Sequence, residues 1–144
     1  MEEALEAYCK TLEVQGKKVM DRFSHCCRVA QNALLLGTRL GLEASDLELL
    51  KAASLLHDIG KLTMQGSLAA PKMDHGQYAV QLLQKDDLIR TFLPKIDDEL
   101  IYFAIRNHNQ FTVEETTDPK KQLFALLVRD ADKLDIFYRF TDLS

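Results

Sequence analysis

Apolar residues recur every three or four positions along most of the chain, which is the spacing of helices with one buried face. No segment alternates apolar and polar residues as a half-buried strand does. The pattern therefore predicts an all-α fold, an orthogonal bundle of about five to six helices. The predicted helices cover residues 2–14, 17–40, 45–60, 75–84, 97–107 and 120–140.

Start and stop signals agree with these helices. Gly41 stands at a C-terminal cap position, and Asp118 precedes a proline that suits the first helical position. Ser45 with Glu48, and Asp74 with Gln77, have the spacing of capping boxes. Residues 61–73 show no period and are expected to form a loop.

Length and composition agree with this fold and exclude several classes of protein. The 144 residues fit one domain, 1–144, and the net charge of −4 disfavours nucleic-acid binding by a broad positive surface. No apolar stretch approaches a membrane span, and the acidic N-terminus is unlike a signal peptide. The odd set Cys9, Cys26 and Cys27 suits reduced thiols, which we expect to be small buried side chains of a cytoplasmic protein.

The pair His57-Asp58 closes a predicted apolar helix and is followed by Gly60. Neighbouring side chains diverge in mid-helix, but at a helix C-terminus both can reach one cation, which the partial negative charge of that helix end favours. A surface dipeptide or a capping arrangement is the alternative for the pair alone. His25 lies on the inner stripe of its own helix, where a buried imidazole needs a partner, and a shared metal site would supply one.

Three carboxylates, Asp130, Asp132 and Asp135, follow in the last predicted helix. Helical periodicity mildly favours Asp130 as the inward carboxylate, because the apolar residues Leu123, Leu127, Leu134 and Phe137 share its stripe. A solvated acidic face is the alternative for at least two of the three.

His25, the run Leu55-Leu56-His57-Asp58-Ile59-Gly60-Lys61 and the run from Ala131 to Asp135 resemble the HD-domain phosphohydrolase superfamily. The resemblance covers residues 23–140 and implies one divalent metal bound by His25, His57, Asp58 and Asp132. It thus selects Asp132, whereas periodicity favours Asp130. His75 and His108 match positions where some members hold a second metal. The run His108-Asn109-Gln110-Phe111-Thr112 departs from the Gly-Tyr-Pro signature of the cyclic-dinucleotide phosphodiesterases.

The resemblance implies hydrolysis of a phosphate ester or anhydride, often of a nucleotide, by a metal-bound water. Imidazole and carboxylate ligands suit Mn, Fe, Co, Ni, Mg or Zn. Asp58 is expected to act also as a general base, and Lys61 and Arg28 to bind substrate phosphate. Two rival hypotheses are a non-catalytic metal- or nucleotide-sensing module and a plain helical interaction domain.

The chain ends soon after Asp132, where many relatives continue. A pocket completed by another subunit, or truncated at the C-terminus, is therefore expected. Homo-oligomerisation is left open by the sequence.

Overall fold

The computed structural model describes residues 1–141, which contain helices and no strand. The predicted all-α bundle is confirmed. Its elements are α1 (Glu2–Cys9), α2 (Lys17–Arg39), α3 (Ala44–Leu56), α4 (Ile59–Gln65), α5 (His75–Gln84), the 3₁₀ segment η1 (Lys85–Thr91), α6 (Asp98–Asn107) and α7 (Pro119–Thr141).

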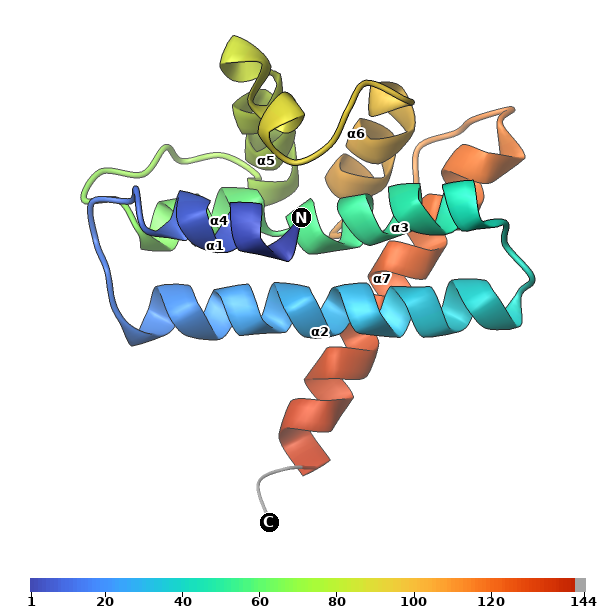
Figure 1. Ribbon diagram of the computed structural model, residues 1–144, viewed down its shortest axis with the longest axis horizontal. Helices are drawn as coiled ribbons and strands as arrows, with labels where there is room; N and C mark the ends of the chain where they lie inside the picture. Colours follow the sequence, from blue (N-terminus) through green and yellow to red (C-terminus); the bar gives the residue numbers. More distant parts are fainter. Residues whose placement is uncertain (142–144) are drawn as a thin grey trace.

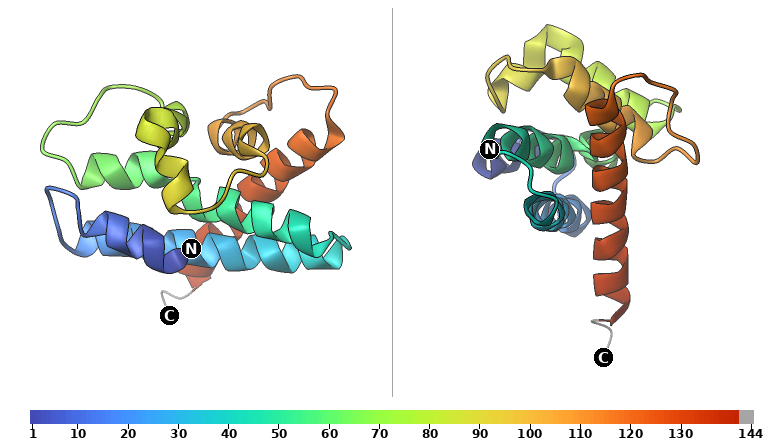
Figure 2. Two further views of the ribbon diagram at one scale, coloured as in Figure 1. Left: turned by 45° about the horizontal axis from the view of Figure 1, so that its top comes forward. Right: turned by 90° about the vertical axis from the view of Figure 1, so that its right-hand side faces the viewer.

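The helices form two layers crossed by the last helix (Figure 1). The long helix α2 runs beside α3, and α4 continues nearly in line with α3 after a short break. Helices α5 and α6 cover the opposite side of the α3–α4 layer. Helix α7 packs on α2, α3 and α6 and crosses α2 steeply, so that its C-terminal half projects beyond the bundle (Figure 2).

The core lies where α2, α3, α6 and α7 meet, and its apolar side chains are almost fully buried. Leu50, Leu55, Leu56, Ile101 and Phe124 each have no exposed surface. Burying such side chains contributes about 1.5–3 kcal/mol each, which is the main force that holds the helices in place. The site described below lies at the edge of this core.

Several predicted caps are present. Gly41 has a φ of 78°, and its N–H bonds to the Thr38 carbonyl while Leu42 N–H reaches Gly37, which together end α2 in a Schellman motif. The carboxylate of Asp74 accepts the N–H of Gln77 at 3.0 Å and caps α5. Asp118 accepts the N–H of Lys120 in the first turn of α7.

Several predicted boundaries are wrong. Helix α1 ends at Cys9 instead of residue 14, and residues 10–14 form turns and bends. Helix α3 begins at Ala44, its N-cap is Glu43, and no side chain caps it, so the predicted box at Ser45 does not form. The predicted loop 61–73 begins with helix, because α4 extends to Gln65.

The sequence predicted that a helix ends at Gly60. In the structure Gly60 lies buried inside α4. A Cβ at this position would lie 2.2 Å from the His75 carbonyl oxygen and 2.9 Å from the Ala79 nitrogen. Glycine is therefore needed for the close contact between α4 and α5. That contact brings His75 beside the His57-Asp58 pair.

Within residues 1–141, every helix is too short or too polar to cross a membrane.

Candidate metal centre

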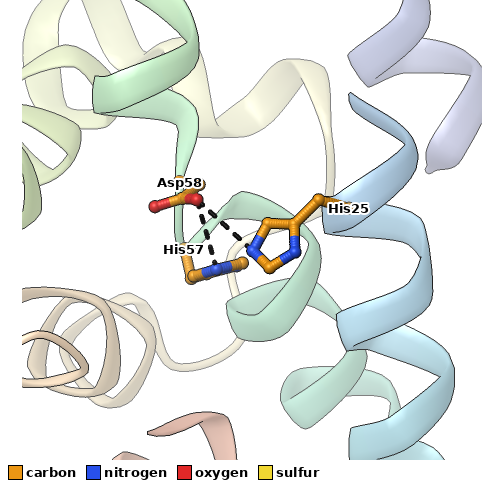
Figure 3. Close-up of side chains that lie close together, drawn as sticks. All are labelled: His25, His57 and Asp58. Atoms are coloured by element: carbon orange, nitrogen blue, oxygen red, sulfur yellow. Dashed lines mark ion pairs between the residues drawn. The ribbon is translucent and has the colours of Figure 1, made fainter. Parts of the chain in front are cut away.

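His57 and Asp58 occupy the break between α3 and α4. His57 is the C-cap of α3 with helical dihedral angles, whereas Asp58, with φ −108° and ψ 15°, departs from the helix. This change of backbone direction turns two neighbouring side chains toward one point, which a continuous helix would prevent. His25 approaches the same point from α2 (Figure 3).

Four side chains from three separate stretches of the chain form the first half of the site. The Nε2 atoms of His25 and His57 lie 3.5 and 3.6 Å from Asp58 Oδ2. Asp132 on α7 places its Oδ1 2.8 Å from His25 Nε2 and 3.5 Å from His57 Nε2. His25, His57 and Asp58 are buried, and Asp132 is partly exposed.

Two further histidines converge on the other oxygen of Asp58. The Nε2 atoms of His75 and His108 lie 3.9 and 3.6 Å from Asp58 Oδ1. His75 begins α5, and His108 caps the end of α6. Asp58 therefore has one oxygen toward each pair of imidazoles.

The second ring nitrogen of His57 and of His108, Nδ1, contacts a backbone carbonyl. Nδ1 of His57 bonds to the Ser54 carbonyl and Nδ1 of His108 to the Ile105 carbonyl, each at 2.5 Å. Because a carbonyl only accepts, each Nδ1 carries the proton and each Nε2 has its lone pair free. His57 Nε2 is fully buried and has no hydrogen-bond partner in the described chain.

The charged groups of the cluster shift one another's pKa values. Burial opposes ionisation of Asp58, but the charges of His57, His108 and Arg22 outweigh it and hold its pKa well below the usual range. Burial likewise opposes ionisation of Asp132, yet the neighbouring imidazoles of His25 and His57 lower its pKa. Both carboxylates are therefore anionic near neutral pH and suited to a cation.

The two imidazoles with shifted pKa values behave differently. Burial disfavours charge on His57, but Asp58 and Asp132 outweigh this and raise its pKa. For His75 the pKa is lowered, and burial is the largest cause. Burial thus favours the neutral form of the His75 imidazole, the form that binds a metal ion.

The side chain of Asp132 faces the cluster, while Asp130 is exposed. The stripe that favoured Asp130 was misleading because two of its apolar members, Leu134 and Phe137, are 43% and 68% exposed on the projecting half of α7. The buried face instead follows Phe124, Val128, Ala131 and Asp135.

The two expected phosphate ligands differ in placement. Lys61 lies half-buried in the first turn of α4, near enough for its charge to act on His75, and it forms no hydrogen bond or ion pair within residues 1–141. Arg28 instead binds Asp135, with Nε 2.6 Å from Oδ1. That carboxylate bonds to His25 Nδ1, on the side of the ring away from Asp58 and Asp132.

The sequence analysis overlooked Arg22 and assigned no role to Asp135, and both side chains contact the cluster. Arg22 donates from Nη1 to Asp58 Oδ2 at 3.0 Å, and Asp135 lies 2.5 Å from His25 Nδ1. The signals were present: Arg22 precedes His25 by one helical turn, and Asp135 follows Asp132 by one turn. Both spacings put the residue on the same helix face as a cluster member.

The donor set fits a divalent metal ion. Three overlapping groups each place one ligand atom per residue within 4.8 Å of the others: His25-His57-Asp58, His57-His108-Asp132 and Asp58-His75-His108. The buried, unpartnered Nε2 of His57 is the atom that an ion would satisfy. Neutral imidazoles with carboxylates suit borderline and hard divalent ions.

Comparison with known proteins agrees with this geometry. The family model of the HD domain matches residues 22–136, a range that contains every histidine and carboxylate of the cluster. No curated protein and no solved structure matched the chain. Since the match covers most of the chain and the histidine-aspartate pair lies among further imidazole and carboxylate groups, the chain belongs to the HD-domain family, within a superfamily of metal-dependent phosphohydrolases.

Proposed function

We propose that the protein is a metal-dependent phosphohydrolase that cleaves a phosphate ester or anhydride of a small phosphorylated molecule, with nucleotides as the first class to test. The observation that carries the proposal is the convergence of buried imidazole nitrogens and carboxylate oxygens, with His57 Nε2 left unpartnered. Membership of the HD-domain family supports the same chemistry.

The first ion would be held by His25, His57, Asp58 and Asp132. His75 and His108 would hold a second ion together with Asp58, whose two oxygens face the two pairs of imidazoles. A divalent ion bound here lowers the pKa of a water molecule and polarises a phosphoryl group. Asp58, kept anionic by its neighbours, is the proposed acceptor for the proton of that water.

Lys61 is the proposed partner for substrate phosphate. It is half-buried, it forms no ion pair in residues 1–141, and its charge acts on His75. A compact ammonium beside the cluster would balance the negative charge of a bound phosphate. Replacing Lys61 by alanine should raise KM by about tenfold, because it removes a charge-assisted hydrogen bond that contributes about 1.5 kcal/mol to substrate binding. An unchanged KM and kcat would remove Lys61 from the site.

The decisive experiment is a phosphate-release screen over mono- and dinucleotides and small phosphate esters. Wild-type protein is tested with Mn²⁺ and after chelation, beside a His57→Ala, Asp58→Ala double variant. The matched control is Asp130→Ala, an exposed carboxylate outside the cluster. We expect metal-dependent release by the wild type and the control, and loss of both metal and activity in the double variant.

The outcomes separate the rival functions. A protein that binds metal through these residues and releases phosphate from no substrate would be a metal-sensing module. A protein that binds no metal would contradict the proposed function altogether.

A further inference from the structure

His25 differs from the other buried histidines of the cluster in what holds its ring. The Nδ1 atoms of His57 and His108 bond to backbone carbonyls three residues earlier, which the helix ends supply. His25 lies in the middle of α2, where neighbouring carbonyls are used by the helix. Its Nδ1 faces a side chain instead, Asp135 Oδ2 at 2.5 Å, 110 residues away in the chain.

Asp135 is itself firmly held. Its side chain is 1% exposed. Arg28, one turn after His25 on α2, donates from Nε to Oδ1 at 2.6 Å and from Nη2 to Oδ2 at 3.2 Å. Arg139 adds a longer ion pair at 3.6 Å. A two-point contact with a guanidinium fixes both the position and the plane of a carboxylate.

The geometry has a direct consequence for His25. An ionised Asp135 only accepts, so the proton of the contact resides on Nδ1. The opposite nitrogen, Nε2, then points at Asp132 and Asp58 with the ring angle set by Asp135. Carboxylates that hold the far nitrogen of a metal-binding histidine set its orientation and raise its basicity.

Taking a metal ion at His25 as in the proposed function, we propose that Asp135 and Arg28 form a positioning pair that presents His25 Nε2 to the ion. Asp135 contacts the ring nitrogen opposite to the one that faces Asp58 and Asp132, so it would act on the ion through His25. Their role is to keep His25 in the ligating tautomer and orientation. Arg28 thereby contributes to the site through Asp135.

Mn²⁺ affinity of the full chain, measured by titration calorimetry, tests the pair. Asp135→Asn should weaken binding by roughly 10–100-fold, the range for loss of such a partner. Arg28→Lys keeps the charge but loses the planar fork, and should weaken binding by about three- to tenfold. The matched control is Asp130→Asn, the same substitution at an exposed position of the same helix, which should bind as the wild type does.

A second readout is independent of affinity. In Zn²⁺-loaded protein, nitrogen-15 NMR should show the His25 Nδ1 proton far downfield in the wild type and in Asp130→Asn. In Asp135→Asn that resonance should move upfield or exchange away. If Asp135→Asn does not fold, the same two measurements on Arg28→Lys decide.

Failure of this inference is distinct from failure of the proposed function. Wild-type protein that binds no Mn²⁺ contradicts the function. Wild-type protein that binds Mn²⁺, with folded variants of equal affinity and an unchanged Nδ1 resonance, overturns the positioning pair alone.

Discussion

At the scale of single residues, the two oxygens of Asp58 divide the cluster into two halves. Oδ2 faces His25 and His57, while Oδ1 faces His75 and His108. A carboxylate that can contribute to both halves is suited to bridge two ions. Removal of an imidazole from one half should then leave the other half able to bind its ion.

His75→Ala tests this division. We expect metal content to fall from about two ions per chain to about one, because the first half keeps all four of its proposed ligands. Elemental analysis of Mn²⁺-loaded protein measures the ratio, with His57→Ala as the variant that should lose the first ion. A wild type that binds a single ion, or a His75→Ala variant that keeps two, would contradict a second site.

The cysteines give a prediction that does not depend on metal. Burial raises the pKa of the Cys9 thiol to about 11 and that of Cys26 well above its ordinary value. Cys27 is half-buried, and burial raises its pKa as well. At pH 8 a thiol with a pKa of about 11 is only about one part in a thousand ionised, and the thiolate is the reactive form.

Alkylation of folded protein at pH 8 should therefore modify Cys27 first and leave Cys9 and Cys26 intact until the chain unfolds. Mass spectrometry of the labelled peptides identifies the sites, and urea-unfolded protein, in which all three react, is the control. Rapid labelling of Cys26 in folded protein would show that the core around α2 opens.

Site residues could be predicted where they are adjacent in the sequence. Contacts between distant helices could not be predicted, because they depend on how the helices pack. The pair His57-Asp58 was recognisable because its two side chains are adjacent in the sequence. Arg22 and Asp135 share a helix face with a cluster member, but their contacts could not be predicted, since their partners lie 36 and 110 residues away. Nothing in the sequence states which α2 position faces which α7 position.

At the scale of helices, the sequence predicted most of the elements but neither α4 nor the 3₁₀ segment η1. Helix α4 has only seven residues, too few to be stable alone, and it forms because Gly60 and Leu62 are buried against other elements. Local patterning carries no information about that support. The false box at Ser45 has a related cause, because residues with capping chemistry also occur within the first turn of a helix.

The contact between α4 and α5 makes Gly60 a sensitive position. Gly60→Ala adds a carbon against backbone atoms, which cannot move without shifting a helix. We expect the free energy of unfolding to fall by about 1–3 kcal/mol, despite the better helix propensity of alanine. Urea denaturation measures the change.

Gly37 provides the matched control within a helix. Its added carbon would meet the ends of Leu47, Leu50 and Leu42 side chains, which can rotate away. Gly37→Ala should therefore change stability by less than about 1 kcal/mol. Equal losses at the two positions would show that the backbone contact at Gly60 is unimportant.

At the scale of the whole molecule, the proposed ion would join α2, the α3–α4 break and α7. An ion that binds only the folded form stabilises it by about 2.7 kcal/mol at a hundred times its Kd. For a chain of this length, the melting temperature should rise by roughly 5–10 °C. Thermal melts followed by circular dichroism, with and without Mn²⁺, measure the shift.

The His57→Ala, Asp58→Ala variant should melt at the same temperature with and without Mn²⁺. A wild type that shows no shift at saturating Mn²⁺ would mean that the cluster does not bind the ion in the folded state. A shift that survives in the variant would place the ion elsewhere.

The position of Asp132 and Asp135 on α7 has a consequence for the order of events during biosynthesis. While α7 is still inside the ribosome, the nascent chain already carries all four histidines but lacks these two carboxylates. Ion binding by the His25 half should therefore wait until α7 has left the exit tunnel and packed on α2.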